Sequence, residues 1–315
     1  MSLSQRRRKS DKQGPCASPV HGGSYIGGKF RRPQHDIRLL LADVDGTLLT
    51  QEKVLTEEAK GAANGLRHAG VTLAITSGRP PRGMKMLIEP LALDSVIAGF
   101  NGGLLVNPDF SVIESYTLDP ATAKETLKLM VDQGLDAWVY TVKEWLIRDA
   151  NAPHVAREAW TVKFDPEIVE RFSDAQLSRA VKIVGISDDL ELVAACAKAA
   201  QNALGPKANA ARSQPYYLDV THPKANKGMV VQTLSNLLNI PCEQIATIGD
   251  MPTDIPMFRK SGFSIAMGNA SDEVKAEADA VTDSNDNEGF AKAARKLLSH
   301  RETARSRHPN HTTPN

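Results

Sequence analysis

Runs of apolar residues alternate with amphipathic stretches along most of the chain. The unbroken apolar runs predict buried strands at residues 37–44, 71–76, 96–98, 245–249, 263–267 and 280–282. The stretches between them predict helices at residues 56–69, 80–89, 227–238, 253–260, 271–278 and 288–298. Strands that alternate with helices are typical of a parallel sheet with helices on both faces. The pattern therefore predicts an α/β fold with a Rossmann-like parallel-sheet core.

Residues 118–214 follow a different rhythm, between the two halves of that pattern. They predict helices at 121–133 and 189–204, and strands at 137–148 and 180–186. Two helices with hairpin-like strands are typical of a small α+β layer. We therefore predict a discontinuous core, made of residues 37–117 and 215–300, with an α+β cap domain inserted at residues 118–214.

Both ends of the chain differ from this core. Residues 1–36 hold a basic cluster and several glycines but few apolar residues, so they predict a disordered basic tail. Residues 301–315 predict a polar, frayed tail. The formal net charge of the 315 residues is +1, of which residues 1–35 carry +7 and the remainder −6. Because the folded part is mildly acidic, we expect no nucleic-acid partner.

The composition also bears on the compartment. Cys16, Cys196 and Cys242 are too few and too widely spaced for a metal pattern or a disulfide framework, which favours a reducing compartment. No apolar run approaches the roughly 20 residues that cross a bilayer, and the amino terminus lacks the apolar segment of a secretory signal. These features predict a cytoplasmic protein without a membrane partner. They leave the oligomeric state open, with a monomer favoured.

Polar residues gather where four of the predicted elements end or begin. Asp43 and Asp45 follow the first apolar run, and positions two apart in extended chain point the same way. The other three groups are Ser77-Gly78-Arg79, Lys227, and the pair Asp250 and Asp254. Ligands bind at the carboxyl edge of parallel sheets, where these groups are expected to meet. Carboxylates without cysteine or histidine favour Mg²⁺, while hydroxyl, amide and lysine donors match phosphoryl oxygens.

Together these residues resemble the four ordered motifs of the haloacid dehalogenase superfamily. The motifs are Asp43-Val44-Asp45-Gly46-Thr47, Ser77, Lys227, and Asp250 to Asp254. An insert between the second and third motifs is similar to that of the Cof-type, or IIB, phosphatases of this superfamily. The resemblance spans roughly residues 37–298. It implies a phosphoric monoester hydrolase that works through an aspartyl-phosphate intermediate.

The resemblance also implies a role for each matching residue. Asp43 matches the nucleophile, and Asp45 matches the residue that protonates the leaving oxygen and then activates water. Lys227 matches the lysine that steadies nucleophile and phosphate, and Ser77 matches the hydroxyl that binds the phosphoryl group. For the Mg²⁺ site, the resemblance implies Asp43, the backbone carbonyl of Asp45, and Asp250, with Asp254 beside them.

One position departs from the family pattern, because Thr253 stands where Cof-type proteins usually have asparagine. Direct metal contact at position 253 is therefore not expected, although the Thr253 hydroxyl is expected to reach the site through a hydrogen bond. Asp254 is expected to act from behind the ligands. Gly78, Arg79, Asn101 and Gly102 are further candidates for phosphate binding, although Asn101-Gly102 also fits a turn. The cap residues that could face substrate are Trp138, Tyr140, Trp145, Arg148, His154 and Arg157.

The sequence thus predicts a Mg²⁺-dependent phosphatase acting on a small phosphorylated metabolite. Sugar phosphates come first, with nucleotide and pyridoxal phosphates as alternatives. A phosphomutase of the same superfamily is one rival. The other is a non-catalytic phosphosugar sensor, against which the intact pair Asp43 and Asp45 speaks.

Overall fold

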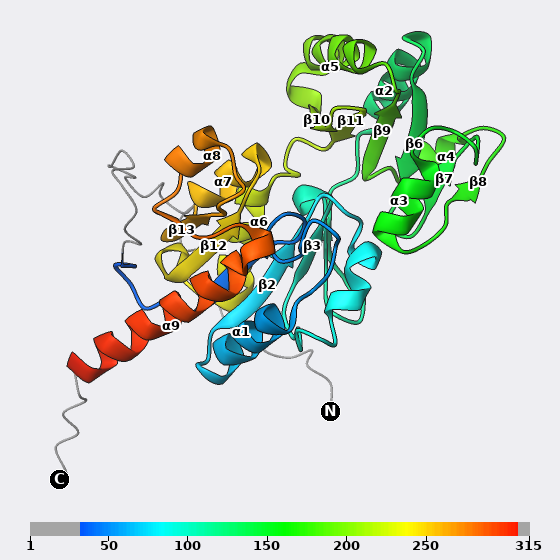
Figure 1. Cartoon of the computed structure of the whole chain (residues 1–315). Coiled ribbons are helices and arrows are strands. Elements are labelled where there is room, and N and C mark those ends of the chain that lie inside the picture. Colours follow the sequence, from blue (N-terminus) through cyan, green and yellow to red (C-terminus); the bar gives the residue numbers. More distant parts are fainter. Residues whose placement is uncertain (1–31, 308–315) are drawn as a thin grey trace, which may run out of the picture.

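The structure is a computed structural model that describes residues 32–307, with side chains up to Arg301. Residues 1–31 of the predicted basic tail and residues 308–315 of the predicted polar tail lie outside this range. Two sheets organise the described chain, one in the core and one in the cap (Figure 1). Within the described range, no helix is both long enough and apolar enough to cross a membrane.

The core is built on an eight-stranded sheet in the order β14-β13-β12-β1-β2-β3-β4-β5. The strands are parallel except at β4 and β5, which pair antiparallel. Their bounds are β1 Leu39–Asp43, β2 Thr72–Thr76, β3 Ile97–Gly99, β4 Leu104–Val106, β5 Val112–Ser115, β12 Ile245–Gly249, β13 Phe263–Ala266 and β14 Ala280–Val281. β1 is buried throughout and lies between β2 and β12, as its unbroken apolar run predicts.

Helices cover both faces of this sheet (Figure 1). α1 (Glu57–His68) and α9 (Gly289–Arg307) pack together over one face, in a cluster that includes Leu40 and Ala42 of β1. α6 (Lys227–Leu238), α7 (Ile255–Phe258) and α8 (Asp272–Ala276) cover the other face, which carries Leu39 and Leu41. Alternate residues of β1 therefore enter opposite cores. The α/β fold class with a parallel-sheet core is confirmed.

The cap is built on a six-stranded sheet in the order β10-β11-β9-β6-β7-β8. The bounds are β6 Asp136–Tyr140, β7 Trp145–Ile147, β8 Glu167–Ile168, β9 Lys182–Ile186, β10 Asn209–Gln214 and β11 Tyr217–Thr221. α2 (Pro120–Asp132) and α5 (Leu190–Leu204) pack on one face through a separate apolar cluster. α3 (Val155–Val162) and α4 (Asp174–Leu177) complete the layer. β11 belongs to this sheet although the predicted cap ends at residue 214.

Three predicted elements differ from the structure. The expected helix at 80–89 is a 3-10 helix, η1 (Pro81–Leu87), and the expected helix at 253–260 is divided into η5 (Pro252–Asp254) and α7. In the second segment Pro256 lacks the backbone N–H that a continuous α-helix would use at this position. The single expected strand at 137–148 is the antiparallel pair β6 and β7. The remaining 3-10 helices are η2 Phe100–Gly102, η3 Gly205–Lys207, η4 Cys242–Gln244 and η6 Asn285–Asn287.

Candidate active site

The parallel register of the core brings the four predicted groups to one edge of the sheet. Asp43 ends β1 and pairs with Thr76, which ends β2 immediately before Ser77. On the other side of β1, Ala42 pairs with Ile248, so Asp250 follows the end of β12 beside Asp43. Lys227 is the first residue of α6. The side chain of Asn226 caps this helix by accepting a hydrogen bond from the backbone amide of Met229. The structure therefore gathers residues that are far apart in sequence.

Lys227 connects two of the carboxylates. Its Nζ lies 2.5 Å from Asp43 Oδ1, and it also contacts Asp254 Oδ1. All three side chains are buried, since Lys227 is 2% exposed, Asp43 4% and Asp254 0%. Burial lowers the pKa of Lys227, but the charges of Asp254 and Asp43 outweigh burial and raise it. The lysine therefore stays charged and fixes the orientation of the Asp43 carboxylate.

Asp254 uses both of its carboxylate oxygens within the protein. While Oδ1 contacts Lys227, Oδ2 accepts from the backbone amides of Asp250, at 2.9 Å, and Met251, at 2.8 Å. Gly249 makes this approach possible, because a Cβ there would lie 2.4 Å from Asp254 Cγ. Asp254 thus holds both the lysine and the loop that carries Asp250. Asp254 is therefore placed to orient Lys227 and Asp250, since both of its oxygens already have partners within the protein.

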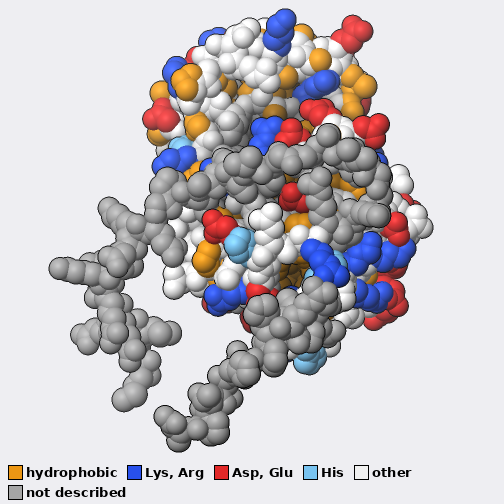
Figure 2. Space-filling view, turned by 90° about the vertical axis from the view of Figure 1, so that its left-hand side faces the viewer, with side chains coloured by type: hydrophobic (Ala, Val, Ile, Leu, Met, Phe, Trp, Pro, Cys, Tyr) orange, Lys and Arg blue, Asp and Glu red, His pale blue; other side chains and the backbone are white. Residues whose placement is uncertain are grey.

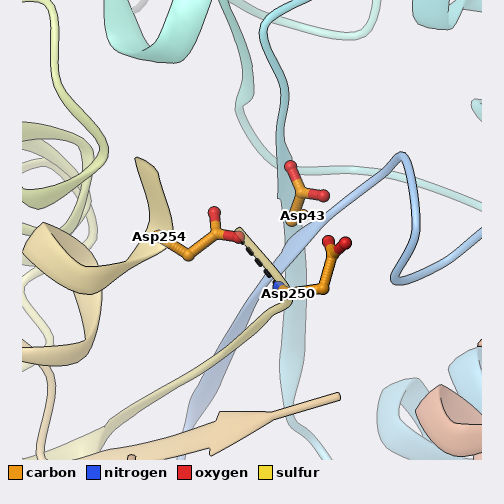
Figure 3. A group of neighbouring side chains, drawn as sticks. All are labelled: Asp43, Asp250 and Asp254. Carbon is orange, nitrogen blue, oxygen red and sulfur yellow. Dashed lines mark hydrogen bonds between the residues drawn. The ribbon is translucent and has the colours of Figure 1, made fainter. Parts of the chain in front are cut away.

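Three carboxylates form a cluster that fits a divalent cation. One oxygen each from Asp43, Asp250 and Asp254 lie within 4.8 Å of one another, and Figure 3 shows the carboxylates of Asp43 and Asp250 side by side. Burial raises the pKa of Asp43 most, and the negative charges of Asp254 and Asp250 raise it further. The charge of Lys227 lowers this pKa but does not offset the rise, so it stays well above 3.8. Burial and the charge of Asp254 raise the pKa of Asp250 to about 6. Lys227 brings one positive charge to three carboxyl groups, so both the oxygen donors and the remaining demand for positive charge suit a divalent cation.

Asp250 is held in this cluster from two further sides. Thr47 Oγ1 donates to Asp250 Oδ1 at 3.0 Å, and Asn269 Nδ2 lies 3.3 Å from Asp250 Oδ2. Asn269 Nδ2 also donates to the carbonyl of Gly46 at 2.9 Å. Gly46 has φ +80°, and a Cβ there would lie 2.3 Å from Asp250 Oδ2, so this turn requires glycine. The loop after β1 and the loop after β13 therefore meet on Asp250.

Sequence reasoning missed Asn269. The residue follows β13 at the same edge of the sheet as the four predicted groups, and it is exposed. Met267-Gly268-Asn269 looks like an ordinary turn, and a single asparagine carries no charge that would mark a site. Its position shortly after an apolar strand of the parallel sheet could have predicted it, because Asp43 and Asp250 also lie where such strands end.

Asp45 is turned toward a set of cations. Arg79 Nε lies 2.7 Å from Asp45 Oδ2 and Arg79 Nη2 2.5 Å from Oδ1, while Lys53 Nζ lies 2.8 Å from Oδ1. Burial raises the pKa of Asp45, but the hydrogen bonds and charges of Arg79 and Lys53 outweigh it and lower the pKa to about 2. Asp45 is therefore ionised. Arg79, expected at the phosphate, is instead paired with this carboxylate, and its Nη1 donates to the cap carbonyl of Thr161 at 2.7 Å.

The remaining phosphate-binding candidates lie around Ser77. Ser77 Oγ accepts from the Arg79 amide at 3.1 Å, and its backbone carbonyl accepts from the Asn101 amide at 2.8 Å. A Cβ on Gly78 would lie 3.7 Å from the Asn101 side chain, so these two positions are neighbours. Gly102, at φ +97°, packs against the start of α6, where a Cβ would lie 3.0 Å from the Asn226 carbonyl. Asn101-Gly102 therefore connects the Ser77 loop to the helix that begins with Lys227.

Thr253 stands apart from the cluster. Its side chain is exposed, and among the described residues it makes no hydrogen bond. The structure therefore lacks the expected hydrogen bond from the Thr253 hydroxyl to the site within the described residues. Thr253 therefore does not help to orient Asp250. Thr47 and Asn269 contact the Asp250 carboxylate instead, and Asp254 accepts from the Asp250 amide.

The cap candidates divide into two groups. Trp138, Tyr140 and Trp145 are buried on the face of the cap sheet that lies toward the core. Arg148 faces Asp136 at 3.6 Å, and His154 pairs with Asp188 at 2.9 Å and stacks on Tyr216. Arg157 is exposed beside Tyr216.

On the face shown in Figure 2, acidic and basic side chains both occur over the cap and over the core.

Comparisons with known proteins agree on one family. Residues 40–293 match the haloacid dehalogenase-like hydrolases. The chain is 27% identical to the 5-amino-6-(5-phospho-D-ribitylamino)uracil phosphatase of Bacillus subtilis, covering 84% of this chain and 97% of that protein. It is 26% identical to the pyridoxal phosphate phosphatase of Escherichia coli, covering 81% and 96%. A haloacid dehalogenase-like hydrolase from Bacteroides thetaiotaomicron has the same fold, with a TM-score of 0.77 at 24% identity over 83% of this chain and 100% of that one.

Proposed function

The chain belongs to the haloacid dehalogenase-like hydrolases, and on this premise we propose that it is a Mg²⁺-dependent phosphatase that releases phosphate from a small phosphorylated metabolite. The expectation of a phosphoric monoester hydrolase agrees with the phosphatase names of its relatives and is confirmed. The observation that carries the finer proposal is the buried Lys227 on Asp43, with Asp250 beside them. A nucleophile, a fixed cation and a metal position then share one edge of the sheet.

Asp43 is the proposed nucleophile. Lys227 occupies its Oδ1, which leaves the other oxygen to attack phosphorus. The new bond joins Asp43 to phosphorus, while the bond from phosphorus to the ester oxygen breaks and its electrons leave with that oxygen. Water then attacks phosphorus, the bond to Asp43 breaks, and inorganic phosphate departs. Lys227 offsets negative charge in both steps because it lies between Asp43 and Asp254.

Asp45 is the proposed proton carrier. It lies two residues beyond Asp43 and next to Ser77, whose Oγ is 3.5 Å from Asp45 Oδ2. Because Asp45 is ionised in the free protein, in the first step it takes the proton of the phosphate monoester monoanion and passes it to the leaving oxygen, and in the second step the ionised Asp45 takes a proton from water. The pairing with Arg79 and Lys53 holds the ionised form, which is the form that the second step needs.

Asp43, the Asp45 backbone carbonyl and Asp250 are the groups proposed to hold Mg²⁺, with Asp254, Thr47 and Asn269 orienting them. When bound there, Mg²⁺ supplies positive charge for the phosphoryl oxygens. The excess negative charge and the raised pKa values of Asp43 and Asp250 support this assignment. Ser77 and the backbone of the loop that follows it are the proposed contacts for the phosphoryl group.

The substrate class is proposed from the relatives and from the site. The named substrates of the relatives include a phosphorylated ribitylaminouracil and pyridoxal phosphate, both small phosphate esters. A sugar or polyol phosphate is our first candidate, because the ribityl chain is itself a polyol. The substrate is therefore proposed to be a hydroxyl-rich metabolite rather than a macromolecule.

The test is phosphate release from a panel of sugar, polyol, nucleotide and pyridoxal phosphates, each with and without Mg²⁺. The panel also contains p-nitrophenyl phosphate, whose leaving group makes few demands on the site. Release that requires Mg²⁺ supports the proposal. Transfer of phosphate between positions of a sugar without release would identify a phosphomutase, and binding without either reaction would identify a sensor. Both of those outcomes would refute it.

A further inference from the structure

One polar group interrupts the core-facing side of the cap sheet. Along β6, β9 and β11, alternate residues face the two sides, and Val139, Ile183 and Leu218 pack in the cluster under α2 and α5. The opposite side carries Trp138, Trp145, Val184 and Ile186, which join the cluster shared with the core. Lys182 and Asp219 have the same parity as Val184 and therefore lie on this side. A cation and a carboxylate are unexpected on a buried apolar face.

Lys182 and Asp219 form a buried ion pair. Lys182 Nζ lies 3.0 Å from Asp219 Oδ2, and each side chain is 9% exposed. Lys182 pairs with Tyr140 on one neighbouring strand and Thr221 on the other, so a row of polar groups crosses three strands. Taking two charges out of water is costly, and such pairs are often no more stable than apolar residues of the same size. Packing alone does not explain this pair.

The ion pair lies over the loop that follows β2. Lys182 Nζ is 3.5 Å from the carbonyl of Gly78, between Ser77 and Arg79. On the same side of the cap, α3 contributes Glu158, which accepts from the Tyr140 hydroxyl at 2.8 Å. Burial raises the pKa of Tyr140 well above 10.0, so its hydroxyl keeps the proton that it donates. The cap thus presents an ammonium and two carboxylates next to the proposed phosphate contacts.

Asp219 has an unused acceptor. Its Oδ1 is buried and has no hydrogen-bond partner among the described residues, although the side chain is nine-tenths buried. A buried carboxylate oxygen without a donor carries a cost that native proteins rarely accept. A ligand that brings a donor would satisfy it. This feature, together with the position of Lys182 over Gly78, indicates a contact for the part of the substrate that leaves with the ester oxygen.

We propose that Asp219 and Lys182, with Glu158, select a leaving group that carries adjacent hydroxyls, as a polyol or sugar does. A hydroxyl can donate to Asp219 Oδ1 and accept from Lys182, which a flat ring without donors cannot do. The inference rests on the proposed phosphatase function. It adds which cap residues recognise the substrate.

The experiment compares kcat/KM for sorbitol 6-phosphate and pyridoxal 5′-phosphate with that for p-nitrophenyl phosphate. The parent protein is expected to prefer the polyol phosphate. Asp219→Asn is expected to lose about 10–100-fold more kcat/KM on the polyol phosphate than on p-nitrophenyl phosphate, because the amide oxygen stays with Lys182 and the NH2 group replaces the Oδ1 acceptor that a hydroxyl needs. A matched control is Glu125→Gln on α2, which breaks the exposed pair of Glu125 with Lys207 of η3. It should change neither substrate's rate.

Asp219→Asn leaves the buried Lys182 without the negative charge of its partner, so a second variant protects the test against misfolding. The double variant Lys182→Met, Asp219→Leu replaces the ion pair by apolar residues, which buried sites often tolerate. It should fold, and it should lose the polyol preference as Asp219→Asn does. An unchanged preference in a folded double variant overturns the inference. A parent protein that hydrolyses none of the phosphate esters instead refutes the proposed function, so the two failures are distinguishable.

Discussion

Arg79 donates to both carboxylate oxygens of Asp45, at 2.7 Å from Nε and 2.5 Å from Nη2. The same guanidinium donates to the carbonyl of Thr161, which belongs to α3 of the cap. A single side chain therefore connects the residue proposed to carry the proton with the domain proposed to select the substrate. Arg79 itself is 5% exposed, whereas the Asp45 side chain is 30% exposed, so this connection is shielded from salt and water on the arginine side.

The first prediction concerns pH and this ion pair. Since the pKa of Asp45 is lowered from 3.8 to about 2, the pair stabilises the fold above pH 3.8 and loses this effect as the pH falls toward 2. Arg79→Met should lower the free energy of unfolding near neutral pH by on the order of 1–2 kcal/mol. The difference from the parent should shrink as the pH falls through that window. Urea unfolding of both proteins at a series of pH values measures it.

The control for this series is Arg259→Met, which breaks the exposed pair of Arg259 with Glu277. Exposed pairs contribute little, so this variant should remain close to the parent at every pH. An Arg79→Met deficit that stays constant with pH would show that the arginine stabilises by packing and not through the charge of Asp45.

The second prediction tests the nucleophile. Asp43→Asn should abolish phosphate release, because an amide of the same shape cannot attack phosphorus. Burial and the nearby carboxylates disfavour the charge of Asp43, so the variant should unfold at the same temperature as the parent or at a higher one. Phosphate assay and thermal unfolding measure the two effects. Asp109→Asn, in an exposed turn, is the control, and substantial turnover by folded Asp43→Asn would remove Asp43 from the proposed role.

The third prediction separates Asp250 from Thr253. Asp250→Ala removes a proposed metal ligand and should raise the Mg²⁺ requirement steeply or eliminate activity. Thr253→Ala should leave the Mg²⁺ requirement close to that of the parent, because the side chain is exposed and makes no hydrogen bond within the described chain. A Mg²⁺ titration of the initial rate compares the two. Equal damage from both substitutions would contradict the placement of Thr253 outside the cluster.

The fourth prediction concerns Asn269. Its side chain joins the Gly46 carbonyl to Asp250, so Asn269→Ala should free the Asp250 carboxylate. Loss of such an orienting contact typically costs about 10–100-fold in metal affinity or activity. The measurement is the Mg²⁺ concentration for half-maximal rate, with Asn287→Ala as control, since within residues 32–307 Asn287 bonds only to the nearby Ser284. A Mg²⁺ requirement like that of the control would show that Thr47 and Asp254 suffice.

The sequence was informative where an apolar strand ends in charge. The burial of β1 and β12 follows from their composition, and their parallel pairing then brings Asp43 and Asp250 together. Asn269 and Arg79 were harder to place, because a neutral turn residue and a cation at a helix start each have many ordinary uses. Their partners, Gly46 and Asp45, lie on another strand's loop. Such contacts depend on how loops approach across the sheet, which no local pattern encodes.

The cap shows the same limit in its strands. The sequence of β10, Asn209–Gln214, holds few large apolar residues, so it was not recognised as a strand. Its pairing with β11 supplies the order that its own composition does not. The polar row of Lys182 and Asp219 became visible only through the register of β9 with β11, because each residue alone looks like an ordinary charge.

The insertion of the cap also decides when a newly synthesised chain can become active. Lys227 meets Asp43 across 184 residues, and Thr47 meets Asp250 across 203. All six strands of the cap sheet lie between these partners, in one continuous stretch of sequence. During translation the cap can therefore pair its strands before the core sheet receives β12, because contacts nearer in sequence form faster. A ribosome-bound chain that ends before β12 already contains Lys227 but lacks Asp250 and Asp254, so the proposed nucleophile has neither its proposed metal position nor the carboxylate that holds its lysine, and activity is expected only with the last strands of the core.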